Sequence, residues 1–565
     1  MPMTDGFHPA LVFFIGAAVV AMLRGVARSA VSVLVPIVSF CFLLGFEPGI
    51  HGQFSLLQYS LEPIRVDDLS LLFGYLFHLA AFIGVIYAWH VRDAMQQVSA
   101  LAYAGAAMGA VFAGDLVTLF VFWELLALTS VFLVLAPRTD KALRTGMRYL
   151  IWNVLSGVML LAGVLLFARE SGTVVFDQME AIGLGPWLIL LAFGVKCGFP
   201  LFHTWIIDSY PASTATGTVF LSAFTTKTAV YALARGFPGT EELIYIGAVM
   251  TAFPIFYAVI ENDLRKVLSY SMINQIGFMV VGIGIGTELA LNGAVSHAFA
   301  DVIFKGLLFM SMGAVLHMTG KTTGTDLGGL YKTMPKTTIL CIIGALSISA
   351  FPLFSAFITK SMIMSAALHE GYDWLWFILL FASAGVLEHA GIKIPYFAFF
   401  AHDSGIRTKE PPKGMLIAMA ISAFFCIYIG TRPEFLYSLL PWTVDYVPYT
   451  ASHVVTQLQI LFFAALAVVF LVRSNMYPPE VRGINVDLEW TYRKAGAAVW
   501  RGTWGGALAV YALATAIGKA IVDVAIAVAH ELHGPRGIFA RTLPIGTSAF
   551  FAALLLAIFL LLYFW

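Results

Sequence analysis

The stretch Gly194-Val195-Lys196-Cys197-Gly198-Phe199-Pro200 places a lysine inside an apolar segment and follows it with residues that interrupt a helix. This pattern predicts a discontinuous membrane helix, because freed backbone groups are tolerated at membrane depth only where protein or water satisfies them. A second interruption, Ser349-Ala350-Phe351-Pro352-Leu353-Phe354-Ser355, is followed by Lys360. Two lysine-bearing breaks predict two related halves of one membrane domain.

The amino-acid composition agrees with a membrane domain. The chain has 565 residues, of which 60% are hydrophobic and only 11% charged, whereas a soluble domain carries about 25% charged residues. Apolar stretches of about 17–25 residues, long enough to cross a bilayer, recur from Leu11 to Phe564. We therefore expect an all-α polytopic membrane protein with about 16–17 spans in all.

Residues that bind metals or cofactors in soluble proteins are not arranged for that purpose. The four cysteines lie within apolar segments without paired spacing, which argues against a disulfide framework and a metal centre. The chain has no phosphate-binding loop, dinucleotide fingerprint or hydrolase motif, and its basic residues form no nucleic-acid patch. We expect no cofactor, no metal, no nucleic-acid partner and no soluble-enzyme chemistry.

Lysine and arginine fall unevenly between the spans. If the N-terminus lies outside the cell, 20 of the 32 Lys and Arg residues lie in cytoplasmic loops, Arg265 among them, and 6 lie in the opposite loops. Because cytoplasmic loops are enriched in these residues, we expect the N-terminus to lie outside. The first apolar stretch begins at His8 without a basic region or cleavage site before it, so we expect the mature protein to keep it.

The remaining six basic residues are all lysines within apolar spans. A charge at the bilayer centre costs about 2.5–3.5 kcal/mol on insertion scales, so buried charges are rare unless they are paired, hydrated or functional. Only four carboxylates lie in the spans, so not every lysine has a partner of its own. The lysines are Lys196, Lys227, Lys305, Lys360, Lys393 and Lys519, and the acids are Glu124, Asp301, Glu388 and Asp523.

A row of buried lysines has the chemistry of a proton relay. Burial disfavours the charged form of lysine and a nearby carboxylate favours it, so a buried lysine can exchange a proton as its neighbours change charge. Glu124 has no basic residue within a helical turn, and Lys196 is its candidate partner from another span. The alternative is a static ion pair that holds two helices together, but the helix break after Lys196 favours the relay.

A second group of titratable residues shares one helix face. His297, Asp301 and Lys305 are spaced i, i+4, i+8 and therefore lie about 6 Å apart along the helix axis. They form either a relay or, for Asp301 and Lys305, a static pair. Lys227 has only threonine neighbours in the sequence and is the candidate central carrier.

Other polar residues are weaker candidates for the same path. His203 and Asp208 follow the first helix break in the sequence. Glu388, His389 and Lys393 lie together in one late span and form either an exit from the path or a helix-packing cluster.

Several short motifs occur in order along residues 60–400: Phe122-Trp123-Glu124-Leu125, Pro200-Leu201-Phe202-His203-Thr204-Trp205, Lys227-Thr228-Ala229-Val230-Tyr231, Asp263-Leu264-Arg265-Lys266, His297-Ala298-Phe299, Phe304-Lys305-Gly306-Leu307 and Phe351-Pro352. This order resembles the antiporter-like subunits shared by respiratory complex I, membrane-bound hydrogenases and Mrp-type multi-subunit cation/proton antiporters. The Mrp D-type subunit is the most similar.

The resemblance implies roles for individual residues. Glu124 and Lys196 would form the coupling pair of the first half-channel, and Lys227 would be the central lysine. His297 and Lys305 would form the bridge. Lys360, on the second broken helix, would lead outward.

Two positions depart from the pattern of the family. Asp301 stands where many members have a second histidine, which leaves the protonation order of the bridge open. Lys360 stands where some complex I subunits have glutamate.

The resemblance also implies an organisation and a function. Residues 1–430 would form a proton-translocating core of about fourteen helices in inverted repeats, and residues 431–565 an extension. Within the extension, the polar and aromatic residues of segments 431–450 and 474–503 themselves predict that these segments lie at the membrane surface. The chain would belong to a complex in the bacterial inner membrane, contact other membrane subunits and lipid, and exchange protons for a monovalent cation such as Na⁺. Alternatives are a proton-pumping subunit of a redox-driven complex I-like or hydrogenase assembly and a stand-alone transporter of an organic solute.

Overall fold

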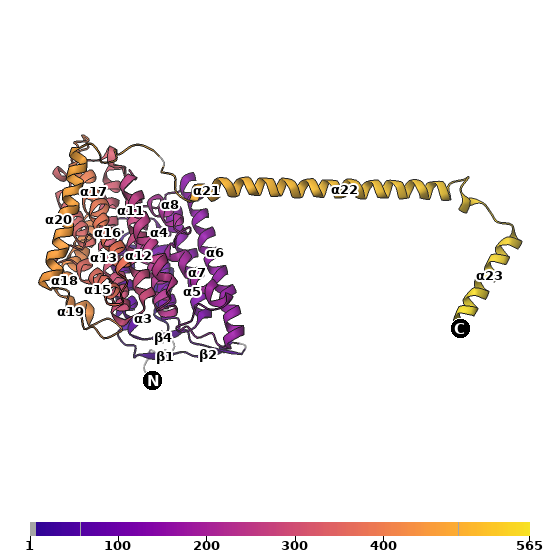
Figure 1. Cartoon of the computed structure of the whole chain (residues 1–565), viewed down its shortest axis with the longest axis horizontal. Coiled ribbons are helices and arrows are strands. Elements are labelled where there is room, and N and C mark those ends of the chain that lie inside the picture. Colours follow the sequence, from indigo (N-terminus) through magenta and orange to yellow (C-terminus); the bar gives the residue numbers. More distant parts are fainter. Residues whose placement is uncertain (1–6, 57, 484) are drawn as a thin grey trace. The chain divides into compact units, whose positions relative to one another are not determined.

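The structure is a computed structural model that describes residues 7–56, 58–483 and 485–565. The chain divides into two compact units, Met1–Asn485 and Val486–Trp565. Twelve helices in the described residues are long and apolar enough to cross a membrane, and three shorter apolar helices accompany them. The expectation of an all-α polytopic membrane protein is confirmed (Figure 1).

Helices make up nearly all of the first unit. Their bounds are α1 (Pro9–Met22), α2 (Gly25–Leu43), α3 (Asp68–Tyr87), α4 (Ala94–Phe112), α5 (Leu116–Leu135), α6 (Asp140–Ser171), α7 (Leu184–Cys197), α8 (Thr204–Ala212), α9 (Gly217–Ala223), α10 (Thr225–Gly236), α11 (Glu242–Ile260), α12 (Leu264–Ile285), α13 (Glu288–Thr319), α14 (Pro335–Ile348), α15 (Ser355–His369), α16 (Asp373–Val386), the π-helical η3 (Leu387–Ile392), α17 (Lys393–Pro395), the π-helical η4 (Tyr396–Phe400), α18 (Lys413–Thr431), α19 (Pro433–Tyr437) and α20 (Ala451–Arg473). Before α3, strand β1 (Gly49–His51) pairs with β4 (Ile64–Val66), and β2 (Phe54–Leu56) pairs with β3 (Tyr59–Leu61).

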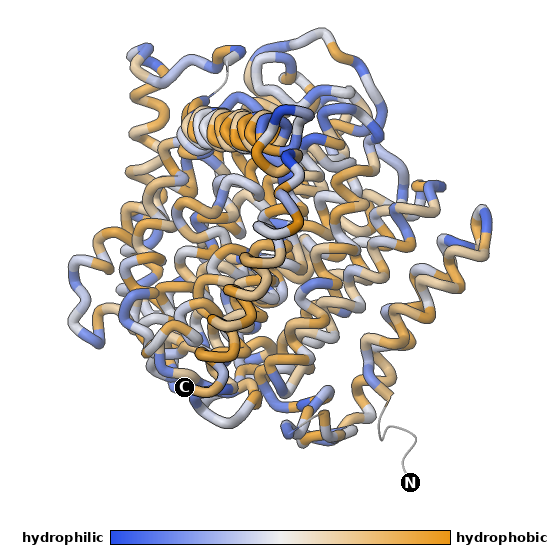
Figure 2. Tube along the Cα trace, turned by 90° about the vertical axis from the view of Figure 1, so that its right-hand side faces the viewer, coloured by the Kyte–Doolittle hydropathy of each residue, from blue (hydrophilic) through white to orange (hydrophobic). Residues whose placement is uncertain are grey.

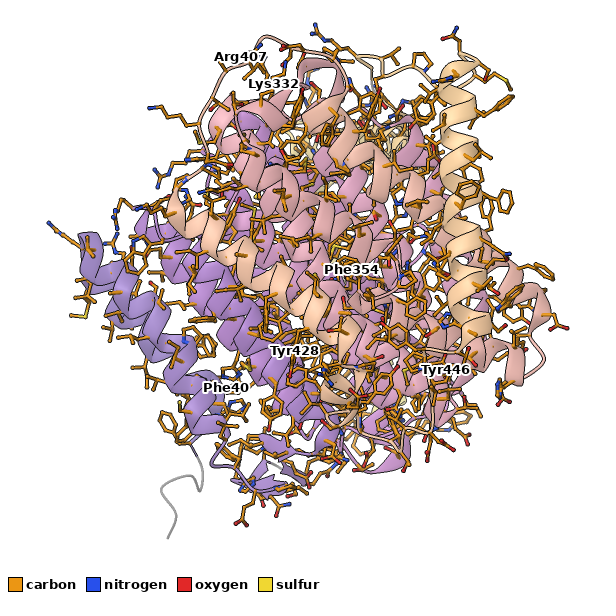
Figure 3. The ribbon with its side chains drawn as sticks, turned by 90° about the vertical axis from the view of Figure 1, so that its left-hand side faces the viewer. Phe40, Lys332, Phe354, Arg407, Tyr428 and Tyr446 are labelled. Atoms are coloured by element: carbon orange, nitrogen blue, oxygen red, sulfur yellow. The ribbon has the colours of Figure 1, made fainter. Side chains whose placement is uncertain are left out.

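Polar residues of the first unit gather at two opposite ends of the helix bundle, with hydrophobic helix surface between them (Figure 2). Lys332 and Arg407 lie at one end, whereas Tyr446 lies toward the other (Figure 3). Phe354, which closes the second helix break, lies between these ends. The bundle therefore has the two polar faces and the apolar middle of a membrane-spanning domain.

Loops that are rich in Lys and Arg also meet in space. Arg138, after α5, pairs with Asp93, after α3, at 3.2 Å. His90 contacts His317 near the end of α13, with 4.7 Å between their ring centroids. The assignment of Arg265 to a loop is wrong: only 2% of its surface is exposed.

Arg265 instead fastens α12 to the end of α8. Its guanidinium donates to the carbonyl of Pro211 at 2.8 Å and to that of Ser213 at 3.1 Å. The carbonyls at the C-terminus of a helix carry partial negative charge, so a buried cation is stabilised there.

The first unit contains an inverted internal repeat. The helices α4 and α11 both have 19 residues, α6 and α13 both have 32, and α7 and α14 both have 14. An isolated antiparallel bridge joins Asp115 to Val175 before α5, and an equivalent bridge joins Asp263 to Thr323 before α12. The start of α5 lies beside Glu62, between β3 and β4 at the lower end of the bundle (Figure 1). The start of α12 lies beside Thr322, in the loop that leads to Lys332 at the upper end (Figure 3), so the two halves run in opposite directions.

Both helix breaks have the same local structure. Each contains Phe-Pro-Leu-Phe, at 199–202 and at 351–354, and the leucine of each has a positive φ, 77° at Leu201 and 76° at Leu353. The first phenylalanine nitrogen donates to a carbonyl five residues earlier, from Phe199 to Gly194 at 3.0 Å and from Phe351 to Leu346 at 3.1 Å. The expected pair of broken helices is therefore present, and the breaks are equivalent.

The second unit contains α21 (Glu489–Thr491), the π-helical η5 (Tyr492–Gly496), α22 (Ala497–His533), the short η6 (Ile538–Ala540) and α23 (Ile545–Phe564). The expected surface segment 474–503 includes α21, η5 and the first turns of α22, which begins at Ala497. With 37 residues and a rise of about 1.5 Å per residue, α22 is longer than the hydrocarbon core of a bilayer, about 30 Å.

Candidate functional site

Five of the six lysines expected in the spans lie in the first unit, and all five are buried. At most 1% of the surface of Lys196, Lys227, Lys305, Lys360 or Lys393 is exposed. Each of them donates to an oxygen atom or pairs with a carboxylate, as the following contacts show. Such contacts are what allow an ammonium group to persist in apolar surroundings.

The first helix break holds Lys196 beside Glu124. The ammonium of Lys196 lies 4.4 Å from the centre of the Trp123 ring and donates to the Trp123 carbonyl at 2.5 Å. Lys196 and Glu124 are within electrostatic range of each other, but Glu124 Oε1 accepts no hydrogen bond within the described residues. The expected neighbours are thus together, although Lys196 is bound to the backbone and not locked in a direct ion pair.

Gly157 makes room for the Glu124 carboxylate. A Cβ atom at position 157 would lie 1.3 Å from Glu124 Oε1, which is far inside a van der Waals contact. Glycine is therefore required on this face of α6 if the carboxylate is to keep its place.

Lys227 lies at the centre of the row, on α10. Its Nζ lies 2.5 Å from Asp301 Oδ2 on α13, and neither side chain has any exposed surface. A second contact runs from Lys227 Nζ to the carbonyl of Ser222 at 3.3 Å. The alternative of a static Asp301–Lys305 pair is wrong, because Asp301 pairs with Lys227 while Lys305 donates to Ser271 Oγ at 2.8 Å.

His297 connects Lys227 and Lys305 with the second break. Its Nδ1 is 2.9 Å from Thr359 Oγ1, and its Nε2 is 3.2 Å from Gln275 Oε1. The next residue after Thr359 is Lys360, and His297 is within electrostatic range of Lys227, Lys305 and Lys360. The helix face predicted from the i, i+4, i+8 spacing is therefore continuous with the second half.

Lys360 binds directly to the backbone at the second break. Its Nζ donates to the carbonyl of Ile348 at 3.1 Å, and Ile348 is the last residue of α14. The same ammonium lies 4.9 Å from the centre of the Phe278 ring. A carbonyl that the break frees from the helix thus stabilises the lysine, as expected for a discontinuous helix at a transport site.

Asp208 is the counterpart of Lys360 in the inverted repeat. Each lies nine residues after the first phenylalanine of its Phe-Pro-Leu-Phe motif. Asp208 is partly exposed and pairs with Arg148 at 2.8 Å, whereas Lys360 is buried. His203 is buried and its ring contacts Phe253, with 4.8 Å between centroids.

Lys393 belongs to a cluster that includes two residues, Glu480 and Tyr477, which the sequence did not indicate as members of the site. Its Nζ lies 2.8 Å from Glu480 Oε1 and donates to the carbonyl of Val259 at 2.6 Å. Glu388 is close enough to Lys393 to interact electrostatically and is hydrogen-bonded by Tyr477. The sequence does not indicate Glu480 and Tyr477 because they lie in a polar segment about 90 residues later. Nothing in the local pattern of residues shows that this segment packs against the helix of Lys393.

The described parts of the chain hold no group of three or more His, Cys, Asp and Glu side chains placed to bind a metal ion. The cysteines are free thiols, and three of them are buried: Cys197, Cys341 and Cys426.

A protein-family model described as NADH:quinone oxidoreductase/Mrp antiporter, TM, matches residues 113–386. This range contains every path residue from Glu124 to Lys360. It ends before Glu388, Lys393 and Glu480, so the match does not cover the late cluster.

Among curated relatives, the D-type subunit of the Na⁺/H⁺ antiporter of Alkalihalophilus pseudofirmus is 33% identical over 285 residues, which is 47% of this chain and 58% of the relative. The corresponding D-type Na⁺/H⁺ antiporter subunit of Bacillus subtilis is 28% identical over 371 residues, 61% of this chain and 72% of the relative. Hydrogenase-4 component B of Escherichia coli is 25% identical over 445 residues, 68% of this chain and 66% of the relative. The chain therefore spans little more than half of the first relative's length.

Two solved structures share the fold. A chain of the Mrp complex from Dietzia sp. aligns with a TM-score of 0.74 at 21% identity, covering 91% of this chain and 62% of that chain. A chain of the membrane-bound sulfane sulfur reductase, an archaeal respiratory membrane complex, aligns with a TM-score of 0.67 at 23% identity, covering 82% of this chain and 97% of that chain. At these identities the similarity establishes the architecture.

Proposed function

We propose that residues 113–386, which match the family model described as NADH:quinone oxidoreductase/Mrp antiporter, TM, belong to that family, and that this chain is the proton-translocating subunit of a multi-subunit cation/proton antiporter. It acts as a transporter subunit and not as an enzyme of its own. Residues 1–430 form the translocating core, and the extension 431–565 contacts other membrane subunits.

The observation that carries the proposal is the buried Lys227–Asp301 pair. Lys227 lies on α10, between the two inverted halves, and Asp301 lies on α13 of the second half. A proton that arrives at either residue changes the charge that the other feels in a water-poor interior, so protonation in one half affects the other. Coupling between two half-channels requires such a connection.

A continuous series of titratable groups extends from this pair to both helix breaks. Lys227 is within electrostatic range of Cys197, the neighbour of Lys196, and of His297, which interacts with Lys360. Protons move along Glu124, Lys196, Lys227, Asp301, His297, Lys305 and Lys360, with His203 and Asp208 near the first polar end. Lys305 takes part through Ser271 and its charged neighbours Asp301, Lys227 and Lys360.

We propose that the end with Lys332 and Arg407 (Figure 3) faces the cytoplasm and that the N-terminus lies outside, and the excess of lysine and arginine in the loops of that side supports this orientation. We propose that the chain lies in the inner (plasma) membrane of a bacterium, which the bacterial source of the two Na⁺/H⁺ antiporter relatives supports. By the same relationship the coupled cation is Na⁺, and the partners are further membrane subunits.

The test is purification of the native complex through a tag on this chain, followed by reconstitution into vesicles. We expect other membrane subunits without redox cofactors to copurify, and an inward Na⁺ gradient to drive proton movement out of the vesicles. The same assay with K⁺ in place of Na⁺ identifies the cation. Transport of an organic solute by this chain alone would contradict the proposal.

A redox-driven pump is the second candidate, because Hydrogenase-4 component B matches 68% of the chain at 25% identity. Copurification of an iron–sulfur, nickel–iron or quinone-reactive subunit would favour this alternative. The same proton path then serves a reaction that the partner subunits perform.

A further inference from the structure

The segment 477–485, which links α20 to the second unit, is bound to one polar end of the bundle by several contacts. Asn262 Nδ2 donates to the carbonyl of Val481 at 3.3 Å, and Asn485 Nδ2 donates to Glu261 Oε2 at 3.2 Å. Arg482 pairs with Asp326 at 2.5 Å. We call residues 477–483 together with Asn485 the cytoplasmic strap, since they lie at the end that is rich in Lys and Arg.

The strap inserts one carboxylate into the bundle. Glu480 Oε1 lies 2.8 Å from Lys393 Nζ, and the exposed fractions of the two side chains are 8% and 0%. Burial raises the pKa of the Glu480 carboxyl, and the Lys393 ammonium opposes this rise. A carboxyl of this kind can take up a proton more readily than one in free solution.

Lys393 connects the strap with the row of charges. Lys393 immediately follows η3, and π-helical segments of this kind occur often at functional sites. On η3, His389 is buried and is within electrostatic range of Lys305, Lys360 and Lys393. The helix η3 also packs against the second break, since a Cβ atom at Gly391 of η3 would lie 2.3 Å from Ser349 Oγ.

We propose that the cytoplasmic strap completes a second proton entrance, in which Glu480 exchanges protons between water and Lys393, and His389 connects Lys393 with Lys305. This inference rests on the proposed proton-relay function. In one step, the N–H bond of the Lys393 ammonium breaks and the proton passes to His389. In the next, Glu480, protonated from water, gives its proton to the neutral Lys393 amine, and His389 passes its proton to the neutral amine of Lys305. Glu480, Lys393 and His389 then return to their initial charges, and one proton has moved from water to Lys305.

The exchange depends on the groups that face Glu480. These are Lys393 on α17, Glu261 at the end of α11 and Tyr477 on the strap. Glu388 on η3 interacts with Lys393 and Tyr477, and Lys266 on α12 pairs with Glu261. Lys266 Nζ is 3.9 Å from Glu261 Oε2, so the entrance holds three carboxylates and two lysines. This charge balance allows one carboxyl to gain or lose a proton without leaving a large unpaired charge.

The experiment compares Glu480→Gln, Glu480→Asp and Arg482→Ala in the assembled complex in vesicles, with Lys227→Met as a reference. Proton movement is followed against pH, and protection of residues 477–485 from hydrogen exchange reports whether the strap stays bound. We expect Glu480→Gln to slow transport about tenfold or more and to flatten the alkaline limb of the pH profile. We expect Glu480→Asp to keep much of the rate, and Arg482→Ala, whose side chain is exposed, to stay within about twofold.

Two outcomes would overturn the inference. The first is a wild-type rate and pH profile for Glu480→Gln; the second is a loss of rate that accompanies loss of strap protection, which would make Glu480 a structural residue. If Lys227→Met also transports normally, the proposed function itself fails. The failure of the strap proposal is therefore distinguishable from failure of the relay.

Discussion

Lys227 Nζ lies 2.5 Å from Asp301 Oδ2, with both side chains fully buried, and this pair joins α10 to the second inverted half. Removing one partner of a buried pair leaves an uncompensated charge, which costs about 3–5 kcal/mol. We predict that Asp301→Asn lowers the melting temperature of the purified complex and abolishes proton movement. Asp301→Asn combined with Lys227→Met is expected to recover stability but not transport.

That double variant separates the structural and functional roles of the pair. Differential scanning measurements of the complex give the stability, and vesicle assays give the rate. Equal melting temperatures for the wild type and the Asp301→Asn single variant would show that Asp301 does not balance the Lys227 charge.

Gly157 is expected to be essential for the Glu124 site. A methyl group there would lie 1.3 Å from Glu124 Oε1, so Gly157→Ala forces the carboxylate away from Lys196 and should reduce transport strongly while the complex assembles. The matched control is Gly146→Ala on the same helix, where the new Cβ would meet the apolar side chains of Leu135 and Val131 and no titratable group. Equal rates for the two variants would contradict this geometry.

Thr359 is expected to hold His297 in position. The Thr359→Val variant keeps the shape but removes the hydroxyl that lies 2.9 Å from His297 Nδ1. We predict slower proton movement without loss of assembly, measured in vesicles. The control is Thr338→Val, because the Thr338 hydroxyl donates to Met334 within its own helix; a similar loss in both variants would mean that the effect is general.

The strained leucines of the two breaks offer a test of the fold. Leu201 has a φ of 77° and is 57% exposed. The Leu201→Gly variant therefore relieves backbone strain of about 1–2 kcal/mol in the left-handed region. Part of this gain is offset because glycine loses more conformational entropy on folding. We predict a higher melting temperature for Leu201→Gly and a lower one for Leu165→Gly, where an exposed leucine lies inside α6. A loss of stability in both would argue against strain at the break.

The carboxylate of Asp67 stabilises the folded protein by an amount that depends on pH. Burial alone would raise the pKa of Asp67, which caps α3, but the hydrogen bond and charge of Arg235 lower it below the ordinary value. The stabilisation is therefore present above the ordinary pKa, about 3.9, and is lost as the pH falls below it. We predict a steeper loss of melting temperature below pH 4 for the wild type than for Asp67→Asn.

The membrane fold and the two breaks were predictable because they depend on local chemistry. Long apolar stretches specify helices in a bilayer, and Gly198 and Pro200 after Lys196 specify where one helix ends. The matching Phe-Pro-Leu-Phe motifs confirm that the second break is related to the first. The inverted repeat becomes visible only when the helix lengths and helix starts of the two halves are compared. No single segment of the sequence indicates it.

The partners of the buried charges were less predictable. The i, i+4 spacing of Asp301 and Lys305 suggested that these two residues pair. Because α10 packs against α13, however, it is Lys227 that pairs with Asp301. The position of Glu480 depends on the route of a polar segment, and Arg265 is buried although its neighbours indicated a loop. Long-range packing decided each of these cases, and local periodicity carries no information about it.

The most direct test of the proton path replaces Lys227 with methionine in the assembled complex and measures cation-driven proton movement across vesicle membranes. Thr228→Val serves as the control, because Thr228 is buried next to Lys227 in α10. We predict that Lys227→Met assembles with the same subunits and moves no protons, while Thr228→Val remains active. A wild-type rate for Lys227→Met would contradict the account, since the buried charges would then be structural.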